Sequence, residues 1–263
     1  MTVDYKNWMP KGMVAGFFAV SAVFFLMFAV LGCSPLLKDG TAKTVLFWVM
    51  LVFALFFCAV AIWTLWLYKV FSYNGKRQLS RQVVEAVASY VDIPEGGVGL
   101  DVGCGSGALA IACAKRNPKA SLVGIDRWGK EYASYNKPLC ERNAKAEGVS
   151  NVSFRQGNAV KLDFADETFD AVTSNYVYHN IPVKDRQALL LETLRTLKKG
   201  GVFAIHDIMT VRRYGDMEAF AASLRRSGYS EVRLIDITAG MFKSDLEATL
   251  LDLGGSRLLV GKK

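Results

Sequence analysis

Three closely spaced glycines between positions 100 and 108 are the first feature that suggests chemistry. The sequence reads Leu-Asp-Val-Gly-Cys-Gly-Ser-Gly-Ala, a short apolar run that leads into the glycines. Glycine lets a backbone approach a ligand closely, and the free N–H groups at the start of a following helix bind anionic and polar groups. Gly103, Gly105 and Ala108 also fit the dinucleotide fingerprint G-x-G-x-x-G/A. The motif therefore indicates a nucleotide-like ligand and leaves its identity open.

An acidic residue, Asp126, ends the next apolar run, which closes with Gly-Ile-Asp. A carboxylate at the end of a strand in this position holds the hydroxyl pair of a ribose. An oxidoreductase that binds NAD or FAD would show the same two motifs, so other residues must decide.

Further motifs follow in order, and together they resemble those of the class I, seven-stranded S-adenosylmethionine-dependent methyltransferases from about residue 78 to the C-terminus. The matching segments are 101–107 (DVGCGSG), 124–126 (GID), 154–159 (FRQGNA), 169–179 (FDAVTSNYVYH) and 197–201 (LKKGG). A dehydrogenase shares only the first two. The resemblance implies a Rossmann-like α/β domain that binds S-adenosyl-L-methionine and transfers its methyl group.

The resemblance also implies where the cofactor is bound. The expected contacts are Asp101, Gly103, Gly105 and Gly107 with the methionine part, Asp126 with the ribose, Trp128, Asn158 and Ala159 with the adenine, and Asn175 as a further contact. The family commonly has Asp where Asn158 stands, but an Asn carbonyl still accepts a hydrogen bond from the adenine amino group.

The acceptor site is expected at the only two histidines, His179 and His206, which both follow or end predicted strands. Ligands of open α/β sheets bind at that edge. We predict His179, His206 and Tyr178 as catalytic residues, with Tyr176 beside them. A base is needed only if the acceptor atom carries a proton, and either histidine has the alternative role of a neutral, hydrogen-bonded structural residue.

The loop at 174–177 reads Ser-Asn-Tyr-Val and lacks the Asn/Asp-Pro-Pro-Tyr pattern of the nucleic-acid and glutamine amino-methylating members. This departure favours a small-molecule or lipid acceptor. A non-catalytic ligand sensor that signals through the membrane stays open as a third class of function, beside the methyltransferase and the oxidoreductase.

Short β-branched runs alternate with amphipathic helices after residue 78, which is typical of a parallel sheet covered on both faces. The expected strands are 98–102, 121–125, 152–156, 171–174, 202–206, 232–237 and 257–260. The expected helices are 81–90, 108–115, 132–147, 184–198 and 216–227.

The chain is 52% apolar, and the excess lies before residue 70. Residues 13–31 and 44–68 contain no charged residue, and each run is long enough to span a bilayer. We therefore predict a transmembrane hairpin in an anchor at 1–72 and a methyltransferase domain at 73–263. A signal peptide is the alternative for the first run, with Cys33 in a faint lipoprotein box.

Lysines and arginines lie mainly before the first run and after the second, with Lys38 and Lys43 between them. The positive-inside rule then predicts that both termini and the methyltransferase domain are cytoplasmic. The net charge of +8 suits an anionic membrane surface, and the absence of a dense basic stripe disfavours nucleic acid as a partner. The five cysteines show neither metal-ligand spacing nor a disulfide framework, so no metal is expected. The acceptor and the oligomeric state do not follow from the sequence.

Overall fold

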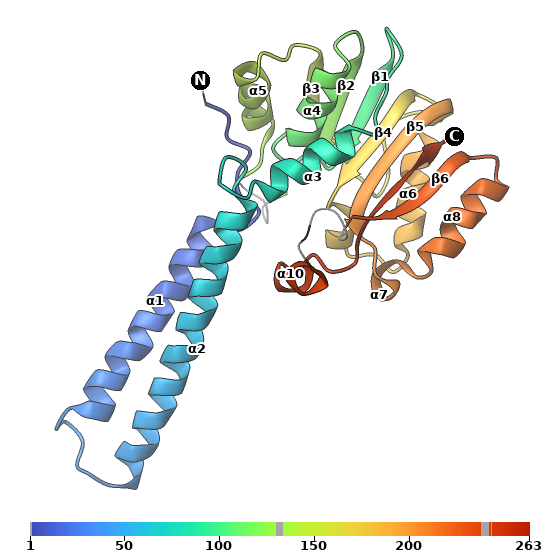
Figure 1. The fold of residues 1–263 in the computed structure, drawn as a ribbon. Coiled ribbons are helices and arrows are strands. Elements are labelled where there is room, and N and C mark those ends of the chain that lie inside the picture. Colours follow the sequence, from blue (N-terminus) through green and yellow to red (C-terminus); the bar gives the residue numbers. More distant parts are fainter. Residues whose placement is uncertain (1, 130–133, 238–241, 243) are drawn as a thin grey trace. The chain divides into compact units, whose positions relative to one another are not determined.

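A computed structural model describes residues 2–129, 134–237, 242 and 244–263 (Figure 1). The chain forms two compact units. The hairpin unit is Asn7–Ser80, and the sheet unit is Arg81–Lys263 together with the N-terminal segment that ends at Lys6. The predicted boundary between residues 72 and 73 lies within the hairpin unit, and the N-terminal segment groups with the sheet unit.

The hairpin unit consists of two long apolar helices. The first is α1 (Lys11–Met27), continued by the π-helical turn η1 (Phe28–Cys33), and the second is α2 (Thr41–Phe71). They pack side by side through stacked rings, with the centroid of Phe24 5.2 Å from that of Phe53. Both helices qualify as candidate membrane spans by length and composition, with mean hydropathies of 2.6 and 2.9. Only 11% of the apolar stretch of each helix is buried. A core helix of a soluble domain would be mostly buried, so these helices suit a lipid environment better.

The sheet unit is built on one sheet of seven strands in the order β3-β2-β1-β4-β5-β7-β6. The strands are β1 (Val98–Val102), β2 (Ser121–Asp126), β3 (Val152–Gln156), β4 (Phe169–Asn175), β5 (Leu197–Ile208), β6 (Ser230–Asp236) and β7 (Ser256–Lys262). Strands β1 to β5 are parallel, whereas β7 is antiparallel to both β5 and β6. The expectation of a parallel sheet is thus wrong at this edge, because β7 returns beside β6 in the opposite direction after the connection at residues 237–255.

Helices cover both faces of the sheet. Their bounds are α3 (Leu79–Ala88), α4 (Ala108–Arg116), α5 (Lys137–Ala146), α6 (Arg186–Arg195), α7 (Val211–Tyr214), α8 (Met217–Arg226) and α10 (Asp245–Leu250). Successive strand residues point to opposite faces. Val172 accordingly packs in the cluster with α6 and α8, and its neighbour Ala171 packs in the cluster with α3 and α4. Two apolar cores therefore fix the sheet between helix layers.

Two predicted elements differ from the structure. The helix expected at 184–198 ends at Arg195, because Leu197 is fully buried and already pairs with Phe169 as part of β5. The helix expected at 132–147 begins at Lys137, and residues 132–133 of that prediction lie outside the described residues. The short helices α7 and α10 were not predicted. Both lie at the edge where the parallel strands end, since the backbone N–H of Met209 bonds to the carbonyl of Gly255 (2.9 Å).

Candidate functional site

The glycine loop joins β1 to α4 with a backbone that favours glycine. Gly103, Gly105 and Gly107 have φ angles of +75°, +55° and +85°. A Cβ on Gly103 would stand 2.3 Å from a methyl group of Val177, so the loop lies tightly against the chain beyond β4. Around the corresponding position on Gly105, no heavy atom of the described residues lies within 4 Å. One side of the loop is thus packed, and Gly105 faces open space.

Asp101, the penultimate residue of β1, is almost completely buried, at 1% exposure. Thr173 donates a hydrogen bond to its Oδ1 (3.0 Å), whereas Oδ2 has no hydrogen-bond partner among the described residues. Burial raises the pKa of Asp101 to about 7. A buried carboxylate oxygen without a donor is costly, so this position favours a cationic or hydrogen-bonding ligand.

Asp126 organises the next loop. Its carboxylate accepts hydrogen bonds from the backbone N–H groups of Gly105 (2.9 Å) and Trp128 (2.7 Å). The indole N–H of Trp128 donates to the carbonyl of Gly105 (3.0 Å), so this ring is anchored to the glycine loop. Each carboxylate oxygen of Asp126 retains a lone pair for a further donor.

The loop after β3 joins the same edge. Gly157 donates its N–H to the carbonyl of Asp126 (2.9 Å), which places the following residues beside β2. Asn158 is exposed, and its Oδ1 accepts the N–H of Val160 (2.9 Å) in a local turn. Ala159 packs against the core. The residues predicted to bind the cofactor, apart from Asn175 at the end of β4, are therefore gathered along the ends of β1, β2 and β3.

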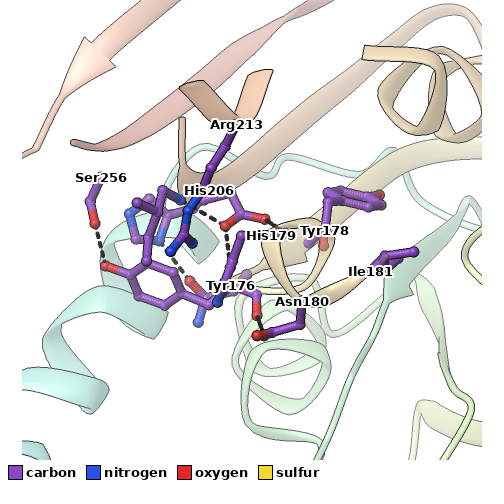
Figure 2. Close-up of polar contacts among 12 residues, drawn as sticks. Tyr176, Tyr178, His179, Asn180, Ile181, His206, Arg213 and Ser256 are labelled. Carbon is purple, nitrogen blue, oxygen red and sulfur yellow. Dashed lines mark hydrogen bonds and ion pairs between the residues drawn. The ribbon is translucent and has the colours of Figure 1, made fainter. Parts of the chain in front are cut away.

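A second cluster lies at the ends of β4 and β5, and Figure 2 shows its polar contacts. His179 belongs to the 3₁₀ turn η3 (Tyr178–Asn180), and its Nδ1 lies 2.5 Å from Oδ1 of Asp207. Asp207 is fully buried and also accepts hydrogen bonds from the N–H of Ile208 (2.7 Å) and the hydroxyl of Tyr214 (2.8 Å). Burial raises its pKa, but the bonds from His179 and Tyr214 outweigh burial and hold the pKa of Asp207 below its usual value.

The ionised Asp207 determines the tautomer of His179. Its oxygen only accepts, so Nδ1 of His179 donates and Nε2 is left with a free lone pair. The side chain of His179 is 15% exposed, whereas His206 is fully buried.

His206 has a different environment. Its Nδ1 lies 2.7 Å from Oδ1 of Asn175, its Nε2 has no hydrogen-bond partner in the described part of the chain, and the residue is fully buried. Burial lowers the pKa of His206 to about 4, so this ring is neutral at physiological pH. The ring of Tyr176 packs against it at a centroid distance of 4.4 Å, and the Tyr176 hydroxyl bonds to Ser256 (2.8 Å).

Tyr178 lies in the core instead of the site. It is fully buried, and its hydroxyl bonds to Thr193 of α6 (2.6 Å). The structure thus brings His179 and His206 together around Tyr176. Tyr178 instead lies in the apolar core beside α6.

Sequence reasoning missed two functional partners of His179. Asp207 was not among the predicted site residues. Arg186 was not considered, yet its guanidinium donates to the carbonyls of Tyr178 (3.2 Å), Ile181 (3.2 Å) and Arg213 (3.2 Å). Arg186 therefore ties the His179 turn to α7. The available signal for Asp207 was its position next to His206 at the end of a predicted strand.

No group of His, Cys, Asp and Glu side chains suited to a metal ion occurs within the described ranges.

A family profile described as a methyltransferase domain matches residues 94–243, more than half of the chain. The demethylmenaquinone methyltransferase of Geobacillus kaustophilus is 34% identical over 119 residues, which cover 45% of this chain and 48% of that protein. The arsenite methyltransferase of Aquipseudomonas alcaligenes is 31% identical over 159 residues, covering 52% and 45%. These matches span about half of the length of each relative.

Among solved structures, a geranyl diphosphate C-methyltransferase from Streptomyces coelicolor, in complex with S-adenosyl-L-homocysteine, is similar with a TM-score of 0.54. Its identity is 14%, and the match covers 71% of this chain and 79% of that chain. This likeness shows the fold alone. The comparisons support the methyltransferase interpretation and give no support to the oxidoreductase or sensor alternatives.

Proposed function

This chain belongs to the class I S-adenosylmethionine-dependent methyltransferases, and from that premise we propose that it methylates the hydroxyl group of a lipophilic phenol or enol, with His179 as the base. Its cofactor is S-adenosyl-L-methionine, which supplies an electrophilic methyl group on a sulfonium. Methyl transfer is an in-line displacement, so the protein must mainly position the acceptor and remove a proton where one is present.

The described residues fit this cofactor. The buried Oδ2 of Asp101 lacks a donor, which suits the ammonium of the methionine part. The open side of Gly105 allows the backbone to approach a ligand. We assign the ribose hydroxyls to Asp126, and the adenine to Trp128, Asn158 and Ala159. Asn175 remains a weaker assignment, because its Oδ1 already accepts from His206.

The His179–Asp207 pair is the single observation that carries the choice of acceptor. A buried carboxylate orients the imidazole and stabilises the imidazolium that forms when Nε2 takes a proton. An amine with a free lone pair, or a thiol that is already partly ionised, gains little from such a base. A phenol is almost fully protonated at neutral pH, so it gains the most. His206 is assigned to shaping the site, since its lowered pKa makes it a poor proton acceptor.

Apolar residues on the rim support a lipophilic acceptor. Val211 of α7 and Leu246 of α10 are 78% and 67% exposed, at the sheet edge where the histidines lie. The two candidate spans indicate that the sheet unit works at a membrane, where a lipophilic acceptor is concentrated. Demethylmenaquinone methyltransferases among the relatives agree with a quinone-like acceptor, without establishing it here.

The test uses the full chain in phospholipid vesicles with two hydroquinones that differ only in a prenyl tail. We expect turnover of the tailed hydroquinone to follow its mole fraction in the bilayer, so that added inert phospholipid at constant bulk concentration lowers the rate. The rate with the tail-free analogue should stay constant. If the rates with both hydroquinones depend only on the bulk concentration of the hydroquinone, the acceptor does not reach the enzyme through the membrane.

The methylated atom is read from the product of the same assay. Methyl on the phenolic oxygen supports the proposal. Methyl exclusively on ring carbon, or transfer to a thiol but not to a phenol, would overturn the assignment of the acceptor atom.

A further inference from the structure

The N-terminal segment that ends at Lys6 belongs to the sheet unit, although 74 hairpin residues (Asn7–Ser80) separate it from the rest of that unit. The N-terminal segment runs alongside α5 (Figure 1). Within it, Tyr5 is only 6% exposed, and its hydroxyl donates to Glu147 (3.2 Å), which in turn pairs with Lys115 of α4 (2.8 Å). We call residues 4–5 the strap.

Asn143 of α5 is the main partner of the strap. The backbone N–H of Asp4 donates to Oδ1 of Asn143 (2.8 Å), and Nδ2 of Asn143 donates back to the carbonyl of Asp4 (3.0 Å). This paired arrangement is the one that a neighbouring β-strand would offer to a peptide. Asn143 is 1% exposed, so its amide depends on protein partners.

The same amide also holds the glycine loop. Nδ2 of Asn143 donates to the carbonyl of Ser106 (3.0 Å), between Gly105 and Gly107. One turn earlier on α5, the thiol of Cys140 donates to the carbonyl of Gly105 (3.2 Å). Two consecutive carbonyls of the loop are therefore held from α5, and one of the two holding side chains is itself fixed by the strap.

Removal of the strap would leave Oδ1 of Asn143 without its donor in a buried place. The amide would then reorient toward water or another donor, and its bond to Ser106 would weaken. The glycine loop would lose one of its two fixed points on α5. Loss of preorganisation in a loop that contacts a ligand lowers affinity for that ligand, while the geometry reached in the bound state is unchanged.

We propose that Asn143 is a positioning residue for the cofactor loop and that the strap completes it, so that the segment leading into the first apolar helix sets the affinity for S-adenosylmethionine. The inference rests on the proposed placement of the cofactor at the glycine loop. The bonds of the strap described above lead to α5 and to Glu147 just after it, so we expect the KM for the acceptor to be little affected.

The test uses the full chain in nanodiscs and the variant Asp4→Pro, which deletes the donating N–H together with the carboxylate that bonds to Lys6. Asp4→Ala, which removes only the carboxylate and should leave cofactor affinity unchanged, is the matched control, and Thr2→Pro controls for the proline. We expect Asp4→Pro to raise the Kd and KM for S-adenosylmethionine about tenfold, the usual size for a lost hydrogen bond at a buried partner. At saturating cofactor, kcat and the KM for the acceptor should stay within about twofold. Thr2→Pro should leave all of them unchanged. An equal loss in kcat would indicate general destabilisation and overturn the positioning role.

Coupling gives a second, independent readout. Because strap and loop communicate through one amide, Asp4→Pro should have little further effect on cofactor affinity in an Asn143→Ala background. Additive losses would overturn the link through Asn143. Gly105→Ala separates the two proposals: if it leaves cofactor affinity unchanged, the placement at the glycine loop is wrong. If it weakens affinity and Asp4→Pro does not, only the strap inference fails.

Discussion

Nδ1 of His179 and Oδ1 of Asp207 lie 2.5 Å apart although 28 positions separate the two residues in the sequence. The contact follows from the parallel pairing of β4 with β5, in which Asn175 is opposite His206. Two adjacent strands thus bring the proposed base and the carboxylate that orients it into contact.

Replacement of the base is expected to impair proton removal only. His179→Gln should lower kcat for a phenol by about 10²- to 10⁴-fold, the usual contribution of a general base, with the Kd for S-adenosylmethionine unchanged. The loss should be much smaller for 2,4-dinitrophenol, which is already ionised at neutral pH. An equal loss for both acceptors would show that His179 acts by shape and not as a base.

Tyr214→Phe provides a graded variant of the same network. It removes one donor from Asp207 (2.8 Å) and keeps the ring that packs in the core. Since His179 and Ile208 still donate, we expect a loss in kcat of only about threefold to tenfold, consistent with one hydrogen bond among several. Steady-state rates with the phenol measure it, and a loss as large as that of His179→Gln would contradict this description of the network.

Cofactor affinity should depend on pH through Asp101. In the free protein its pKa is raised to about 7, and pairing with an ammonium requires the ionised form. Binding below pH 7 therefore releases a proton, so the Kd for S-adenosylmethionine should rise by up to about tenfold for each unit of pH below 7. Calorimetry between pH 5.5 and 7.5 in two buffers measures both the Kd and the proton release. Asp101→Asn should bind weakly and lose this pH dependence, and a wild-type Kd that stays constant over the range would contradict the role of Asp101.

Gly105 and Gly148 form a matched pair for testing the glycine loop. Both have positive φ, +55° and +70°, and neither Cβ position has a heavy atom of the described structure within 4 Å. Alanine at either site carries a similar backbone strain of about 1 kcal/mol or more. Only Gly105→Ala should also weaken cofactor binding, because only that side chain would enter the ligand space. Thermal unfolding of both variants measures the backbone strain, and calorimetry measures the Kd for S-adenosylmethionine. Equal Kd values for the two variants would show that the glycine loop does not contact the cofactor.

Cys33 provides a native reporter of membrane topology. It ends the first candidate span and is exposed, whereas Cys104, Cys113 and Cys140 are buried. The charge bias predicts that the connecting loop lies outside. A membrane-impermeant maleimide should therefore label intact cells, and Cys33→Ser should abolish the label. If labelling requires permeabilised cells, the connecting loop lies inside and the predicted orientation is wrong. If Cys33 stays unlabelled in both intact and permeabilised cells, lipid modification of its thiol is favoured.

Local sequence signals predicted most of the fold. The glycine loop was predicted because glycines at fixed spacing between a β-branched run and a small-residue helix have few other uses. The strand at 98–102 was located to the residue. The reversed direction of β7 could not be predicted, because a single strand has the same alternation in either direction.

The site was less accessible to sequence reasoning. His179 could be proposed from its position after a strand, but its partner Asp207 depends on the register of β4 and β5. Tyr178 and His179 are neighbours in the sequence, and only the 3₁₀ turn determines that the tyrosine enters the core while the histidine stays at the surface of the site. Asn143 gave no signal at all, since both of its partners are distant in the sequence.

The separation of the strap from Asn143 also imposes an order on biogenesis. The two partners are 139 positions apart, with both apolar helices between them. At ordinary synthesis rates, Asp4 waits roughly 10 to 30 s before α5 leaves the ribosome. Contacts of such long range form late, after the locally connected sheet has assembled. The strap therefore docks only after both candidate spans have been synthesised. If the strap sets cofactor affinity as proposed, this affinity would be the last property of the enzyme to form.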